Sequence, residues 1–168
     1  LPDLIEHDAC ALAAFATRDG GQSREMLEQA LEALQMMVHR SGSVDGEGDG
    51  SGIQVDLPRW LWRERLAASG LDGALADDPR FVFAHVFFQT VENAEQHIPR
   101  LDRMLEGHGF QVLWRGEGVV DRGALGPRAT ETPVVFWQMA ALAAEGGAAA
   151  STACYRAMVE IEREIDCH

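Results

Sequence analysis

One cysteine and one arginine stand out as residues suited to carry out chemistry. Cys10 opens the apolar run at residues 10–16, and Arg40 follows a helical pattern that ends near Val38. A cysteine thiolate is a strong nucleophile, and the planar guanidinium of arginine binds a carboxylate through two parallel hydrogen bonds. Each also has a plainer role. A cysteine at the head of an apolar strand is usually an inert core residue, and an arginine after a last helical turn complements the helix dipole.

The elements that position these two residues follow from hydrophobic periodicity. Residues 10–16 are fit for a buried strand. Ser23 predicts the cap of an amphipathic helix that runs to about Val38. The glycine-rich residues 41–52 predict a loop, and residues 53–57 alternate like a half-buried strand. A strand that leads away from Cys10 and a helix that returns bring Arg40 near the start of the strand.

The second half of the chain reads as helices alternating with strands. Pro58 opens a short helix that carries Trp60 and Trp62. Further strands are expected at residues 81–88, 110–114 and 133–139. One further helix is expected at residues 92–107, with Pro99 at its start or at a kink. A last helix is expected at residues 151–165, capped by Ser151 or Thr152. Residues 143–150 predict a loose segment. This order of elements fits helices layered on mostly antiparallel sheets, which is the α+β class.

Charge and composition exclude several classes of function. The chain has 168 residues, enough for one domain, and a net charge of -13 from 14 basic and 27 acidic residues. Nucleic acids and anionic membrane surfaces both require a basic surface, so neither is expected as a partner. No apolar run approaches the roughly 20 residues that span a bilayer. Three cysteines make no disulfide framework, and without a visible signal peptide the prediction is a cytoplasmic protein.

Several motifs, in a fixed order, resemble one enzyme family. They are Asp8-Ala9-Cys10-Ala11, His39-Arg40-Ser41, Gly48-Asp49-Gly50-Ser51-Gly52-Ile53, and residues 121–126 and 129–133 before the strand VVFWQM. Together they resemble the glutaminase domain of the glutamate synthase large subunit, a class II, N-terminal-nucleophile glutamine amidotransferase. The resemblance covers nearly the whole chain and implies an αββα sandwich of the N-terminal-nucleophile (Ntn) hydrolase type, of which this chain holds the front part.

The resemblance implies a glutaminase reaction. Cys10 would be the first residue of the mature chain and attack the side-chain amide of glutamine, with its own α-amine as the general base. Ammonia leaves, and water hydrolyses the glutamyl thioester. Arg40 would bind the α-carboxylate of glutamine. In this family the ammonia travels to further synthase domains or subunits that hold flavin and iron–sulfur clusters. No cofactor is expected in this chain.

The loop around the site has two interpretations. The resemblance places His39, Asp49, Gly50 and Gly52 near the site, whereas the plainer interpretation has the glycines shape a tight loop and His39 play a structural role. The glycine-rich run lacks the carboxylate spacing of a calcium-binding EF-hand loop, so no metal site is expected there.

For the remaining histidines and cysteines, structural roles are expected rather than catalysis or metal binding. His85 is expected in the core or on a sheet surface, and Cys154 in a buried position. His97 and His108 are too isolated in the sequence to predict a pair of metal ligands. Cys167 and His168 at the end of the chain are a weaker alternative for a metal.

Three departures from the family pattern leave an alternative open. Ala11 and Ser41 stand where the family has glycine, and residues 1–9 precede Cys10 as a leader or propeptide-like segment ahead of the amidotransferase-like domain at residues 10–168. The family's oxyanion Asn-Gly motif is missing, since the only asparagine is Asn93. The alternative is a catalytically inactive glutaminase-like module used for partner binding or glutamine sensing. A plain α+β assembly domain rests on composition alone.

Overall fold

The computed structural model describes residues 11–21, 23–37, 42–44, 47–48, 50–131 and 134–165. The chain divides into two compact units, Leu1–Asp56 and Leu57–His168, and each is described by itself. Within these described ranges, no helix is both long and apolar enough to cross a membrane.

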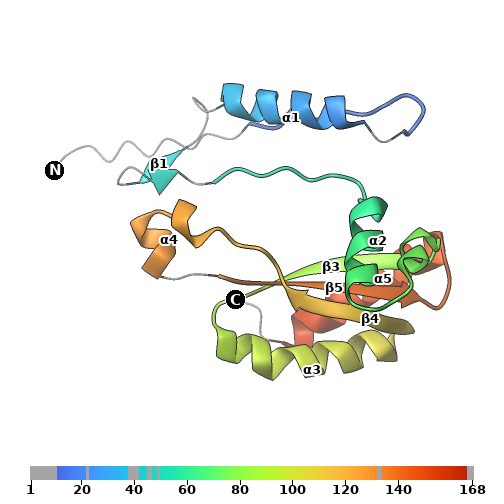
Figure 1. Cartoon of the computed structure of the whole chain (residues 1–168). Coiled ribbons are helices and arrows are strands. Elements are labelled where there is room, and N and C mark those ends of the chain that lie inside the picture. The colour runs from blue at the N-terminus through green and yellow to red at the C-terminus, as the bar shows by residue number, and fades with distance from the viewer. Residues whose placement is uncertain are drawn as a thin grey trace. The chain divides into compact units, whose positions relative to one another are not determined.

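The first unit contains one well-formed helix, α1 (Arg24–Met36) (Figure 1). Its N-cap is Ser23, whose hydroxyl accepts a hydrogen bond from the backbone N–H of Met26 at 3.2 Å, and Glu25 lies in the first turn. The hydroxyl satisfies an amide that has no partner within the helix, and the carboxylate complements the helix dipole. The predicted helix and its cap are confirmed. None of its residues is buried.

Both strands predicted in this unit are wrong over the described residues. Residues 11–16 and 53–57 form no strand, and the side chain of Leu12 is 92% exposed. The apolar patterns are present, but a strand also requires a neighbouring strand to satisfy its N–H and C=O groups. Neither segment pairs with a strand in the described part of the chain.

The glycine-rich segment is not entirely loop. Within it, β1 (Ser43–Val44) pairs antiparallel with β2 (Glu47–Gly48), with Ser43 opposite Gly48 and Val44 opposite Glu47. The prediction of a loop over residues 41–52 therefore missed a minimal β-hairpin, whose two central residues lie outside the described ranges.

The second unit begins with α2 (Arg59–Ala68) directly after Pro58, as predicted. Its apolar residues divide by face, because Trp62 and Leu66 are buried and Trp60 is 54% exposed. A short 3₁₀ helix, η2 (Gly73–Asp77), follows, and the guanidinium of Arg59 donates to the carbonyl of Asp78 at 3.1 Å. The hydrogen bond ties α2 to the segment that leads into the sheet.

A three-stranded antiparallel sheet forms the centre of this unit. Its strands are β3 (Phe81–Phe88), β4 (Phe110–Glu117) and β5 (Val135–Ala143), in the order β3-β5-β4. The predicted strands and their antiparallel pairing are confirmed, although β4 ends three residues and β5 four residues later than expected. The segment predicted to be loose, residues 143–150, is only partly so: residue 143 ends β5, residues 148–150 are helical, and residues 144–147 have no regular structure.

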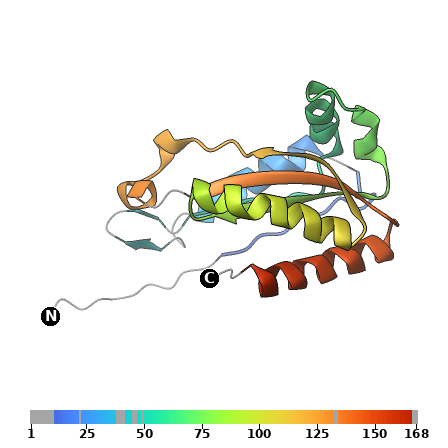
Figure 2. The same ribbon diagram turned by 90° about the horizontal axis from the view of Figure 1, so that it is seen from below.

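Helices cover both faces of the sheet. Figures 1 and 2 show α3 (Val91–Gly107) and α5 (Ala148–Glu164) on one face and α2 on the other. Alternation along β5 follows this arrangement: Val135 and Ala141 pack in the clusters under α3 and α5, and Ala140 and Leu142 pack with Trp62 of α2. Two small elements, η3 (Arg122–Ala124) and α4 (Pro127–Glu131), connect β4 to β5.

The N-terminal ends of α3 and α5 differ from the sequence predictions. Pro99 lies inside α3, which begins eight residues earlier after the cap Thr90, so Pro99 does not start it. The cap of α5 is Gly147, whose positive φ of 63° favours glycine. Ser151 is therefore wrong as a cap, as is Thr152, whose hydroxyl donates to the carbonyl of Ala148 at 2.9 Å inside the first turn.

Candidate functional site

Most of the predicted site residues lie outside the described residues: Cys10, His39, Arg40 and Asp49. Gly50 has a φ of +92°, a conformation that side-chain-bearing residues rarely adopt. A Cβ at Gly52 would meet no atom within 4 Å, so that glycine is not required for space. The backbone conformation at Gly50 agrees with the interpretation that the glycines shape a tight loop. The same conformation would be needed if that loop lay beside a site, so it does not separate the two interpretations.

A chain of polar side chains crosses the α2-facing side of the sheet. Arg65 on α2 donates to Oε1 of Gln138 on β5, and Nε2 of Gln138 lies 3.1 Å from Nε2 of His85 on β3. The strand register places His85 directly opposite Gln138. Because the amide nitrogen of Gln138 only donates, Nε2 of His85 accepts, and the imidazole proton lies on Nδ1.

Two indoles hold Arg65 in place. Its Cζ lies 5.1 Å from the ring centroid of Trp62 and 5.2 Å from that of Trp114. Both distances are within the range of cation–π attraction. Since Trp62 is buried and packs edge-on to Trp114 at 5.6 Å, the guanidinium rests on a rigid aromatic support.

Aromatic rings also surround His85. Phe83 and Phe136 each pack edge-on to it with centroids 5.1 Å away, and Phe87 stacks on Phe136 at 5.0 Å. Burial lowers the pKa of His85, and the positive charge of Arg65 lowers it further. The imidazole is therefore neutral at neutral pH. The network offers hydrogen bonding and stacking at its open end, where Phe87 is 64% exposed, but none of its members carries a thiol or a hydroxyl group.

The sequence alone did not reveal this network. His85 was expected in the core or on a sheet surface, and it lies on the surface. Arg65 and Gln138 are 73 residues apart, and no spacing rule connects a helix to a strand over that distance. Only the strand register brings Gln138 beside His85.

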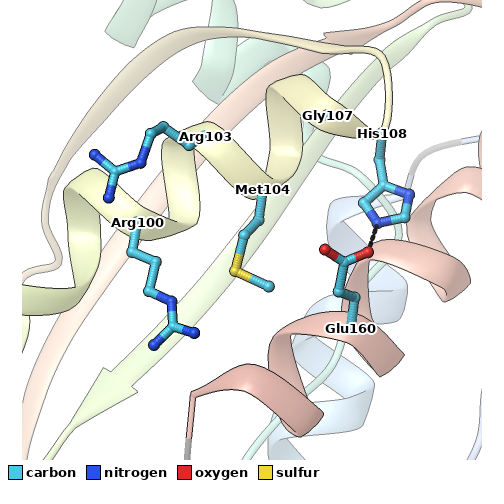
Figure 3. A pocket seen from close by; sticks show the side chains of 6 residues that line it. All are labelled: Arg100, Arg103, Met104, Gly107, His108 and Glu160. Atoms are coloured by element: carbon cyan, nitrogen blue, oxygen red, sulfur yellow. Dashed lines mark hydrogen bonds and ion pairs between the residues drawn. The ribbon is translucent and has the colours of Figure 1, made fainter.

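A second polar cluster lies between α3 and α5, on the opposite side of the sheet. Residues from both helices line a hollow of about 370 Å³. There Nε2 of His108 lies 2.7 Å from a carboxylate oxygen of Glu160, and Figure 3 shows the two side chains pointing toward one another. In the described ranges, no group of three His, Cys, Asp or Glu residues is placed to hold a metal ion. Cys154 on α5 is half-buried, not fully buried as expected, and burial raises the pKa of its thiol.

The family of the chain follows from its similarity to known proteins. Residues 10–166 match the family described as glutamine amidotransferases class-II. The match covers nearly the whole chain, so the protein belongs to this family, and its first matched residue is Cys10. The family predicted from the ordered motifs is confirmed.

The similar curated proteins are glutamate synthases. The chain is 31% identical to the glutamate synthase [NADPH] large chain of Bacillus subtilis over 115 residues, which is 66% of this chain and 7% of the relative. It is 30% identical to that of Azospirillum brasilense over 116 residues, again 66% and 7%. Ferredoxin-dependent glutamate synthase 2 of Synechocystis is 43% identical over 98 residues, or 56% and 6%. The chain thus spans less than a tenth of the length of these relatives.

Proposed function

We propose that this chain carries the glutaminase site of a glutamate synthase-like amidotransferase, with Cys10 as its nucleophile. The observation that carries the proposal is the position of the family match, which begins at Cys10 inside the motif Asp8-Ala9-Cys10-Ala11. An N-terminal nucleophile must be the first residue of its domain, and the start of the match agrees with that requirement. The similarity to three glutamate synthases supports the choice of glutamine as substrate.

The chemistry follows from a cysteine that carries a free amine. After removal of residues 1–9, the α-amine of Cys10 would have the ordinary pKa of such a group, about 8, and be partly neutral at physiological pH. It takes the thiol proton, and the thiolate attacks the carboxamide carbon of glutamine. The C–N bond breaks, and the ammonium returns the proton to the leaving ammonia. Water, deprotonated by the same amine, then attacks the thioester carbon, releasing glutamate and the thiol.

Substrate binding is assigned to Arg40. Its guanidinium matches the geometry of the α-carboxylate of glutamine, and a bidentate pair fixes orientation as well as affinity. His39, Asp49, Gly50 and Gly52 form the loop near the site in this proposal. The positive φ of Gly50 supports a tightly turned backbone there.

The proposed fold is an αββα sandwich of the Ntn hydrolase type. The antiparallel sheet of β3, β5 and β4, with α3 and α5 on one face, supplies one sheet and one helical layer of such a sandwich. A sandwich needs a second sheet against the opposite face. On that face the side chain of Phe87, near the end of the edge strand β3, is 64% exposed, and a second sheet would cover this apolar surface.

The ammonia is proposed to pass to further synthase domains or subunits. This rests on the relatives, which are whole glutamate synthases far longer than this chain. A cytoplasmic location, and the absence of any cofactor from this chain, stay predictions.

The direct test is the intact mass of the protein from its natural host, before and after treatment with a glutamine-mimicking electrophile. We expect a chain that begins at Cys10 and gains one adduct there, with excess glutamine preventing the reaction. The matched control is Cys154→Ser, which should label as the wild type does, because the raised pKa of Cys154 keeps its thiol protonated. An adduct on Cys154, or none on a chain that begins at Cys10, would contradict the proposal.

A second candidate function is a catalytically inactive module that senses glutamine or binds a partner. Ala11 and Ser41 replace family glycines, and the only asparagine, Asn93, lies in the first turn of α3 and is followed by the buried Ala94. Asn93 is therefore not in an Asn-Gly turn, and an oxyanion donor is typically worth about 10²–10³ in rate. Glutamine binding by calorimetry without any ammonia release from the complete protein would favour this candidate.

A further inference from the structure

A charged groove runs between α3 and α5, on the side of the sheet away from the Arg65 network. Two adjoining hollows of about 370 Å³ and 440 Å³ share His108 and Glu160. The first is lined from α3, and Figure 3 shows Arg100 and Arg103 projecting from that helix. The second extends along α5 and is lined by Tyr155, Arg156, Val159, Arg163 and Glu164.

The groove is basic in a strongly acidic protein. Its lining contains Arg100, Arg103, Arg156 and Arg163 against two glutamates, an excess of two positive charges, whereas the whole chain carries a net charge of -13. At physiological ionic strength the screening length is about 8 Å, so a ligand in the groove responds mainly to these near charges. The residues that line the groove therefore favour an anion, in contrast to the charge of the whole chain.

The groove's own acidic groups are already engaged. Arg100 pairs with Glu164 at 2.9 Å, and His108 contacts Glu160 at 2.7 Å. The side chains of Arg103, Arg156 and Arg163 have no hydrogen bond or ion pair within the part of the chain that the structure describes. Three guanidinium groups, each able to bind a carboxylate in bidentate fashion, thus remain available.

The length of the groove favours an extended ligand over a compact one. Arg156 and Arg163 are seven residues apart on α5, which corresponds to about 10 Å along the helix. The rim also carries Tyr155, whose side chain is 65% exposed. Tyrosine and arginine are among the residue types that contribute most at protein interfaces, and a single small anion would contact only part of this surface.

We propose that the groove between α3 and α5 binds an extended, carboxylate-rich polypeptide segment of a partner protein. Carboxylates spaced along the segment pair with Arg103, Arg156 and Arg163, and Tyr155 packs against its backbone or an apolar side chain. The proposal does not depend on the glutaminase reaction, since none of these residues belongs to the proposed site.

The test measures binding of a fluorescein-labelled peptide of eight residues, alternating glutamate and glycine, to the full chain by fluorescence polarisation. The double variant Arg156→Gln/Arg163→Gln should weaken binding about tenfold, the combined effect of two exposed charge-assisted pairs. The matched control, Arg18→Gln/Arg122→Gln, removes the same charge from two exposed arginines outside the groove and should bind as the wild type does. Circular dichroism checks that all variants fold.

Three results would overturn the proposal. Equal loss in both double variants would mean a response to total charge and not to the groove. Equal binding of a glutamine–glycine peptide would mean that carboxylates are not recognised. Inorganic phosphate or citrate binding at least as tightly as the peptide, with the same loss in the groove variant, would mean a small-anion site. Tighter binding of the acidic peptide, lost only in the groove variant and weakened by salt, supports the proposal.

Discussion

The two units of the molecule differ in what they contribute. The front unit, Leu1–Asp56, carries the motifs that resemble the amidotransferase site, yet its helix α1 has no buried residue. In the described residues, the whole buried apolar core lies in the second unit, Leu57–His168, here called the rear unit, from Trp62 to Ile165. The contrast teaches that the residues predicted to do chemistry and the residues that stabilise the fold lie in different parts of the chain.

Size and exposure explain the contrast. A segment as short as the front unit, Leu1–Asp56, buries only a modest fraction of its surface by itself, so its core is marginal. Leu27 and Leu31 on α1 are 41% and 43% exposed, although their spacing follows one helical face. In the rear unit the sheet gives apolar side chains two surfaces to pack on, and helices cover both. Substitutions in the two units should therefore affect different properties.

The largest effect is expected from Cys10→Ala in the complete protein. Removing the nucleophile should lower ammonia release from glutamine by at least about 10³-fold, since loss of a covalent nucleophile in other enzymes costs as much or more. The urea midpoint of unfolding should stay unchanged, because the core lies in the rear unit. Intact glutaminase activity in this variant would remove the catalytic role of the front unit, and a lowered midpoint would show that the two properties are not separate.

The next effect is on stability, in the rear unit. Trp62→Ala deletes a side chain that is 1% exposed and packs on Phe81, Phe83 and Trp114. The free energy of unfolding should fall by about 3–5 kcal/mol, measured by urea denaturation. The matched control on the same helix is Trp60→Ala, at a residue 54% exposed, which should change it by less than about 0.5 kcal/mol. Similar losses in both variants would contradict the assigned core.

Alanine substitutions at two glycines, one in each unit, compare the two units directly. A Cβ at Gly118 would lie 1.9 Å from Cδ1 of Phe136, so Gly118→Ala must displace that ring or the backbone, whose N–H donates to the Phe136 carbonyl at 2.8 Å. A loss of about 1–3 kcal/mol is expected. In the front unit, Gly52→Ala meets open space and should be neutral. The same denaturation experiment checks both, and a neutral Gly118→Ala would show that Phe136 moves freely.

The smallest effect concerns pH. The pKa of His85 is lowered in the folded protein by burial and by Arg65, so the unfolded chain takes up the proton first as the pH falls through about 6.5. This contribution to stability is fully present above that pH and is lost below it, until the folded imidazole is also protonated. His85→Gln should flatten the pH dependence of the free energy of unfolding between about pH 7 and 5. An unchanged slope in the variant would contradict the assignment.

Elements whose signals are local were predictable from the sequence. The hydroxyl of Ser23 caps α1, Pro58 precedes α2, and the apolar run at residues 81–88 forms β3, because each pattern acts within a few residues. The family was also predictable, since its ordered motifs are properties of the sequence. The roles of Cys10 and Arg40 stay predictions, as these residues lie outside the described part of the chain.

Only the tertiary structure decided the features that require contacts between residues distant in sequence. The apolar residues 11–16 have a strand pattern but pair with no strand in the described chain, whereas β5 extends to Ala143 because β3 and β4 bond it on both sides. The Arg65–Gln138–His85 network and the basic groove between α3 and α5 likewise exist only after strand register and helix packing are fixed. Hydrogen bonds and charge clusters need proximity in space, and side-chain type and local spacing cannot specify that proximity.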